Sequence, residues 1–233
     1  MGEHVRVGDL DIWTEQVGEG PDVLLIGGAG DTVESWQFQL DGLADRYRLT
    51  AFDNRGAGRT VMPSGPASVE AMTDDAAGVL RALDISSAHV TGFSGGSIIS
   101  QELALRHPDL VRSLVLQSTW PVMDRYLRSW GLFVRWLVEV APSERAFLEG
   151  FFLDAFLDHD TTERLSEIAA PTLVLAGGRD PTARPPLCRA VAELIPGARF
   201  EVLEEEAHQP FQEVPEEWNA RVDTFWREVE TQG

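Results

Sequence analysis

The sequence contains no lysine and a single cysteine, and each shortage excludes a class of function. All 19 basic residues are arginines, so Schiff-base chemistry, a pyridoxal-phosphate lysine and a P-loop lysine are excluded. The one cysteine, Cys188, cannot form a disulfide within the chain, so the fold does not depend on an oxidising compartment.

Bases of any kind are scarce, and long apolar runs are missing. The 19 bases face 38 acids, and a net charge of −19 opposes binding to a polyanion, so we expect no nucleic-acid partner. The densest apolar stretch, Trp130–Val140, is interrupted by Arg135 and Glu139 and is shorter than the roughly 18 residues of a membrane span. The first residues carry charges where a signal peptide needs an apolar region. We therefore expect a cytoplasmic protein with no membrane partner.

What is present fits an α/β domain. The 233 residues are 43% hydrophobic and 24% charged, an ordinary globular composition with enough chain for a sizeable core. Short apolar runs alternate with amphipathic helical patterns, which predicts a mostly parallel central sheet flanked by helices. We expect the sheet strands at Val23–Ile26, Leu49–Asp53, Ala88–Phe93, Leu114–Gln117, Thr172–Ala176 and Arg199–Leu203, with an antiparallel edge near Val5–Val7 and Leu10–Thr14. We expect the helices at Trp36–Ala44, Val69–Leu83, Ser97–Arg106, Pro186–Ile195 and Trp218–Val229.

The segment 120–170 breaks this alternation, because it is helical and aromatic with no strand pattern. Its apolar residues fall into two helical stripes, Trp130, Phe133, Val134 and Leu137 in the first and Phe147, Leu148, Phe151, Phe152 and Phe156 in the second. We interpret residues 120–170 as a short helical cap inserted between two parts of one core, 1–119 and 171–233. The same apolar surplus also fits an extension of the core, or a subunit interface that would give a homodimer through the cap.

A short motif carries the candidate chemistry. Gly92-Phe93-Ser94-Gly95-Gly96 matches the G-x-S-x-G nucleophile elbow, with a predicted buried strand before it and a helix after it. A turn this tight strains the serine, the neighbouring glycines relieve the crowding, and the helix N-terminus offers N–H groups to an oxyanion. This context favours a nucleophilic Ser94 over an inert serine in a glycine-rich turn.

A nucleophilic serine needs a base, and His208 is the histidine best placed for it. His208 follows the last predicted strand and therefore lies at the same sheet edge as Ser94. We expect structural roles for His89, which opens a strand, and for His107, which ends a helix. His159 has an aspartate on either side, a pattern more typical of a solvated charge cluster than of a metal site, so we expect no metal.

The base in turn needs a carboxylate, and Asp180 follows the predicted strand Thr172–Ala176 at that same edge. The order along the chain is then Ser94, Asp180, His208. An ordinary Asp-Pro turn with Pro181 would also explain Asp180, and Asp124 is a weaker candidate for the same role.

The loop after Ile26 reads Gly27-Gly28-Ala29-Gly30 and can bring backbone N–H groups close to a developing charge. We nominate the amides of Ala29 and Gly95 as the oxyanion hole. A plain tight turn fits the same glycines, and a phosphate-binding loop fits them less well because the spacing is not G-x-G-x-x-G.

Taken together, these motifs resemble the α/β-hydrolase superfamily, nearest to its branch of enol-lactonases, esterases and cofactor-free haloperoxidases. The resemblance is carried by Leu24-Leu25-Ile26-Gly27-Gly28, by Phe52-Asp53-Asn54-Arg55-Gly56-Ala57-Gly58-Arg59, by Gly92–Gly96, by Pro171–Asp180 and by Ala207-His208. It implies a Ser94–His208–Asp180 triad, main-chain donors at Ala29 and Gly95, no cofactor, and a structural role for Asp53 and Arg55.

Two features depart from the pattern of these relatives. Many of them have histidine where this chain has Gly27, which leaves the donor loop reshaped. The cap is also shorter than in many of them, which predicts an open site or one that another subunit completes.

The expected function is hydrolysis of a carboxylic ester, thioester or lactone through an acyl-enzyme on Ser94. Perhydrolysis, C–C bond hydrolysis and cyclisation remain alternatives on the same site, and a non-catalytic ligand-binding protein is an alternative of another class. We expect a small apolar substrate. Its candidate contacts are Gly28, Phe93, Trp120, Trp130, Phe133, Phe151 and Phe152.

Overall fold

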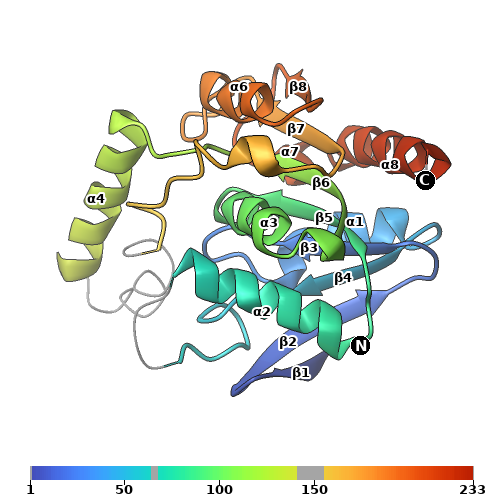
Figure 1. Cartoon of the computed structure of the whole chain (residues 1–233). Coiled ribbons are helices and arrows are strands. Elements are labelled where there is room, and N and C mark those ends of the chain that lie inside the picture. The colour runs from blue at the N-terminus through green and yellow to red at the C-terminus, as the bar shows by residue number, and fades with distance from the viewer. Residues whose placement is uncertain (1, 64–67, 141–154, 233) are drawn as a thin grey trace.

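The computed structural model describes residues 2–63, 68–140 and 155–232, and its centre is an eight-stranded sheet (Figure 1). The strands are β1 (Glu3–Val7), β2 (Leu10–Val17), β3 (Asp22–Ile26), β4 (Arg48–Phe52), β5 (Ala88–Phe93), β6 (Val111–Gln117), β7 (Thr172–Gly177) and β8 (Arg199–Leu203). Their order is β1-β2-β4-β3-β5-β6-β7-β8. β1 and β2 pair antiparallel, β2 joins β4 antiparallel, and the other neighbours are parallel. The predicted mostly parallel sheet and its antiparallel edge are confirmed.

Helices cover both faces of the sheet (Figure 1). The α-helices are α1 (Gln37–Leu43), α2 (Val69–Ala82), α3 (Gly95–Arg106), α4 (Arg125–Val140), α6 (Pro185–Leu194), α7 (Pro210–Glu213) and α8 (Pro215–Gln232), and the 3-10 turns are η1 (Val33–Trp36), η2 (Pro108–Leu110) and η4 (Leu165–Glu167). Leu24 and Ile26 of β3 pack in the core beneath α2, α3 and α6, whereas Val23 and Leu25 pack in the core beneath α1, α7 and α8. Successive strand residues point to opposite faces, so one apolar strand supplies both cores.

In the described part of the predicted insertion, α4 and η4 are helical, and residues 155–164 form bends and turns. Its main element, α4, lies at the left of Figure 1, outside the helices that flank the sheet. An isolated bridge between Val122 and Asp160 joins the two ends of the insertion. The division into a core and a cap stays a prediction. Within the described ranges, no helix is both long enough and apolar enough to cross a membrane.

The sheet has a topological switch point between β3 and β5. From β3 the chain crosses to β4 on one side, and from β5 it crosses to β6 on the other. Connections that leave neighbouring strands in opposite directions open a crevice at their carboxyl ends, where α/β proteins bind ligands. The loops after β3, β5, β7 and β8 all begin at this edge, which brings the candidate residues within reach of one another.

Candidate active site

Ser94 occupies a sharp turn between β5 and α3. Its backbone has φ of 51° and ψ of −120°, a strained conformation for a residue with a side chain. A Cβ on Gly92 would collide with the carbonyl oxygen of Gly96, and a Cβ on Gly96 would collide with that of Ile26. The two glycines of the motif are therefore required for the close approach of strand, turn and helix, as the sequence predicted.

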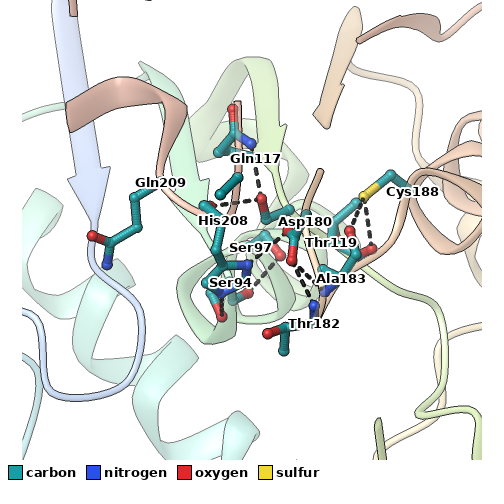
Figure 2. A network of polar contacts seen from close by, with 12 residues as sticks. Ser94, Ser97, Gln117, Thr119, Asp180, Thr182, Ala183, Cys188, His208 and Gln209 are labelled. Atoms are coloured by element: carbon teal, nitrogen blue, oxygen red, sulfur yellow. Dashed lines mark hydrogen bonds and ion pairs between the residues drawn. The ribbon is translucent and has the colours of Figure 1, made fainter. Parts of the chain in front are cut away.

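The three candidate catalytic residues form a continuous chain of hydrogen bonds (Figure 2). His208 Nδ1 lies 2.7 Å from Asp180 Oδ2, and His208 Nε2 lies 3.2 Å from Ser94 Oγ. The other oxygen of the carboxylate, Asp180 Oδ1, accepts the N–H groups of Thr182 at 2.7 Å and Ala183 at 3.0 Å. The carboxylate is fully buried and fixed, whereas the imidazole is 25% exposed and accessible to a substrate.

Backbone bonds hold the two loops that carry Asp180 and His208 together. Gly178 N–H donates to Leu203 O and Arg179 N–H donates to Glu206 O, both at 2.8 Å. A Cβ on Gly177 would collide with the carbonyl oxygen of Ala207, so the Gly177-Gly178 pair lets the loops approach. These contacts fix the distance between the base and its carboxylate.

The loop after β3 forms a turn opposite the elbow. Gly28 N–H donates to Asp31 Oδ2 at 2.8 Å, and Ser35 Oγ donates to Asp31 Oδ1 at 3.0 Å. Burial raises the pKa of the Asp31 carboxyl, while these two bonds and the nearby His208 act in the opposite direction. Among the described residues nothing accepts a hydrogen bond from Ala29 N–H, which leaves this amide available to a ligand oxygen.

The residues nominated as substrate contacts lie in different surroundings. Phe93 is buried beneath the site, its ring 4.9 Å from that of His208, and a Cβ on Gly28 would lie 3.0 Å from this ring. Trp120 is also buried. Trp130 and Phe133 are partly exposed on α4. Phe151 and Phe152 lie outside the described residues, and the substrate contacts stay predictions.

Other reactive side chains have separate roles. The Cys188 thiol donates to the backbone oxygen of Thr119, and burial raises its pKa to about 12, so it stays protonated. Asp124 accepts from the N–H of Leu127 at the start of α4. His159 Nε2 lies 3.4 Å from Oε1 of the buried Glu102. Within the described ranges no three His, Cys, Asp or Glu side chains are placed to hold a metal ion.

Asp53 and Arg55 take structural places, as the resemblance implied. Asp53 is buried and accepts the N–H groups of Val33 and Arg59, both at 2.8 Å. Arg55 forms a two-bond ion pair with Asp75 of α2. Both residues hold the loop after β4 and make none of the triad's hydrogen bonds.

Sequence reasoning did not identify Asp31 as part of this site. The available signal was an acidic residue three positions after Gly28 in a glycine-rich loop, a spacing at which a side chain can bond the backbone of its own turn. Ser118, whose hydroxyl donates to His208 O at 3.0 Å, was also missed, because nothing in the local sequence points across 90 residues.

Comparison with known proteins gives consistent matches over nearly the whole chain. Residues 21–164 match the profile of the alpha/beta hydrolase fold family. The provisionally named carbamate hydrolase RutD of Azorhizobium caulinodans is 32% identical, over 96% of this chain and 97% of its own length.

Two solved structures illustrate the likeness in three dimensions. The provisionally named non-heme bromoperoxidase BpoC of Mycobacterium tuberculosis superposes with a TM-score of 0.84 at 26% identity, covering 97% of this chain and 98% of its own. The enol-lactonase of Burkholderia xenovorans superposes with a TM-score of 0.81 at 23% identity, over 96% and 99% of the two chains. At that identity the second likeness supports the fold alone.

Proposed function

The chain belongs to the α/β-hydrolase family, and on that premise we propose that it hydrolyses a carboxylic ester, thioester or lactone through an acyl-enzyme on Ser94. The observation that supports the proposal is the hydrogen-bonded series Ser94–His208–Asp180, with spacings of 3.2 and 2.7 Å. A serine hydroxyl becomes nucleophilic when a positioned base can take its proton and a carboxylate orients that base. The two hydrogen bonds, from His208 to Ser94 and to Asp180, support both conditions.

In the proposed mechanism, Ser94 Oγ attacks the acyl carbon as His208 Nε2 accepts its proton. Asp180 accepts the Nδ1–H of His208 and stabilises the imidazolium that forms. The N–H groups of Gly95 and Ala29 donate to the oxyanion of the tetrahedral intermediate. His208 returns the proton to the leaving group and then activates the water that releases the acyl group from Ser94.

The proposed substrate is a small, uncharged, apolar molecule. The chain's net charge of −19 disfavours anionic substrates, and the loop before His208 carries three consecutive glutamates, Glu204–Glu206. Partly exposed aromatic side chains on α4, among them Trp130 and Phe133, offer apolar contact area.

Carbamate hydrolysis is the second candidate reaction. The likeness to RutD, at 32% identity over almost the full length of both chains, favours it. The same triad serves both reactions, because a carbamate also passes through a tetrahedral oxyanion at an acyl carbon. Paired p-nitrophenyl acetate and p-nitrophenyl carbamate substrates, compared by kcat/KM, would rank the two.

Substitution of the nucleophile tests the proposal. Ser94→Ala is expected to lower kcat for p-nitrophenyl acetate by roughly 10⁴–10⁶-fold, the loss typical of removing a triad nucleophile. Ser129→Ala, which changes an exposed serine on α4, is the matched control and should keep wild-type activity. A fluorophosphonate should add its mass to wild type and leave Ser94→Ala unmodified. Full activity in Ser94→Ala would assign the reaction to a different site. A wild type that the fluorophosphonate leaves unlabelled would favour a non-catalytic ligand-binding protein.

A further inference from the structure

The turn after β3 is closed by Asp31 in two ways. Asp31 N–H donates to Gly28 O at 3.3 Å, and Gly28 N–H donates back to Asp31 Oδ2 at 2.8 Å. Between them Gly30 has φ of 77°, a conformation that turns of this kind require and that side chains disfavour. Backbone and side chain of one residue thus fix the shape of the four-residue turn Gly28–Asp31.

The turn is also attached to the elements around it. Ser35 at η1 donates its hydroxyl to Asp31 Oδ1 at 3.0 Å, and Asn54 Nδ2 donates to Gly27 O at 3.1 Å. A Cβ on Gly27 would lie 2.8 Å from the Cβ of Asp31, so the Asp31 side chain fills the space beside that glycine. The missing side chain at position 27 and the acid at position 31 therefore belong to one arrangement.

These contacts occupy some of the turn's amides and leave others for a ligand. The Asp31 carboxyl engages Gly28 N–H, while the N–H groups of Ala29 and Gly30 have no acceptor in the part of the chain that the structure describes. We propose that Asp31 is a positioning residue of the oxyanion hole, which holds the Gly28–Asp31 turn so that Ala29 N–H is presented to the oxyanion. This inference rests on the proposed function of Ser94.

The proposed role depends on an acceptor oxygen in the right place and does not depend on charge. In Asp31→Asn, the side-chain oxygen can still accept from Gly28 N–H, and the amide NH₂ can donate to Ser35 Oγ, which accepts as well as donates. Asp31→Ala removes both bonds and frees Gly28 N–H. The pair of variants separates loss of the acceptor from loss of the charge.

The first experiment compares kcat and KM for p-nitrophenyl acetate in wild type, Asp31→Ala, Asp31→Asn and Asp22→Ala. Asp22 is the matched control, because it begins the same strand β3 and pairs with Arg48 at the other end of the sheet. Asp31→Ala should lower kcat by about 10- to 100-fold, less than the roughly 10²–10³-fold cost of losing a donor outright, with KM nearly unchanged. Asp31→Asn and Asp22→Ala should stay within about threefold of wild type.

The second experiment uses a readout that does not depend on the folded fraction of each variant. The ratio of kcat/KM for an ester and its thionoester reports hydrogen bonding to the oxyanion, because sulfur is a weak acceptor. A working oxyanion hole favours the oxygen ester, and a misplaced donor reduces that preference. The ratio should fall in Asp31→Ala and return in Asp31→Asn.

The outcomes separate this inference from the function on which it rests. If Ser94→Ala keeps wild-type activity, the proposed function itself fails. If Ser94→Ala is inactive but Asp31→Ala behaves like Asp22→Ala, or leaves the oxygen-to-sulfur ratio unchanged, the function stands and the role of Asp31 is wrong. A rise in KM alone, or an Asp31→Asn variant as impaired as Asp31→Ala, would also overturn the positioning role.

Discussion

Two histidines mark opposite ends of the sheet and differ in nearly every physical property. His208, at the carboxyl end, is 25% exposed and lies between Asp180 and the Ser94 hydroxyl. His89, at the amino end of β5, is fully buried and stacks on Trp226 with ring centroids 5.7 Å apart. The same side chain can serve chemistry where a substrate can reach it and can serve packing where none can.

The partners of His89 explain why it belongs to the fold. Its Nδ1 lies 2.7 Å from Ser113 Oγ, its Nε2 lies 3.0 Å from Glu230 Oε1, and the Tyr47 ring meets it edge-on. Burial lowers the pKa of His89 to about 4, Glu230 opposes this change, and Arg112 adds to it. A neutral imidazole is therefore built into this end of the sheet.

The largest effect on the contrast between His208 and His89 is expected from Asp180→Asn, which removes the partner of His208. The variant keeps the size of the side chain but loses the carboxylate that orients His208, and kcat should fall by roughly 10⁴-fold. Asp124→Asn is the control, because Asp124 pairs with Arg184, makes none of the triad's hydrogen bonds and should leave kcat unchanged. The measurement is steady-state hydrolysis of p-nitrophenyl acetate. An Asp180→Asn enzyme with more than a tenth of wild-type kcat would remove the carboxylate from the mechanism.

The second prediction concerns His89 at the amino end of β5, and the measured quantity is the free energy of unfolding as a function of pH. Because the pKa of His89 is about 4 in the folded protein and near 6.5 when unfolded, the unfolded chain binds the extra proton between these values. Stability therefore falls as the pH drops through this window, by about 2 kcal/mol from pH 7 to pH 5 for this one group. Urea unfolding at both pH values measures it.

Substitution of His89 tests whether protonation of this residue causes the loss of stability at low pH. In His89→Gln the drop in stability between pH 7 and pH 5 should shrink by most of this amount, while kcat at pH 7 should match that of wild type. His4→Gln, which changes an exposed histidine, should retain the full wild-type drop. The same slope in His89→Gln as in wild type would show that other groups cause it.

The site at the carboxyl end of the sheet could be predicted because the sheet topology determines where its residues lie. Parallel strands place all their following loops at one edge, so Ser94, Asp180 and His208 meet although far apart in sequence. The glycines of the elbow could also be predicted, since a tight strand-to-helix turn requires close backbone approach. The same need at Gly177-Gly178 is seen only in the structure, where an added Cβ would collide with the carbonyl oxygens of Ala207 and Glu204.

The rest of the structure depends on contacts that leave no local pattern. Glu230 bonds His89 although 141 residues separate the two in sequence. Asp31 bonds Gly28 N–H because its side chain points back into its own turn, and no residue pattern predicts that direction. For α4, amphipathic spacing predicted an apolar face but carries no information on what covers it. Sequence periodicity predicts which face of a helix or strand is apolar, whereas tertiary contacts determine which residues pack against that face.

The smallest effects are expected on the exposed face of α4, which carries Phe133 and Trp136. Phe133 is 52% exposed and stacks on Trp136, whereas Leu127 on the same helix is 1% exposed. Phe133→Ala should change the free energy of unfolding by less than about 0.5 kcal/mol, while Leu127→Ala should lose about 2–5 kcal/mol. Urea denaturation of the two variants in parallel measures both. If Phe133→Ala is destabilised as much as Leu127→Ala, this face of α4 is buried in solution, and the contrast between a packed catalytic edge and an exposed helix is wrong.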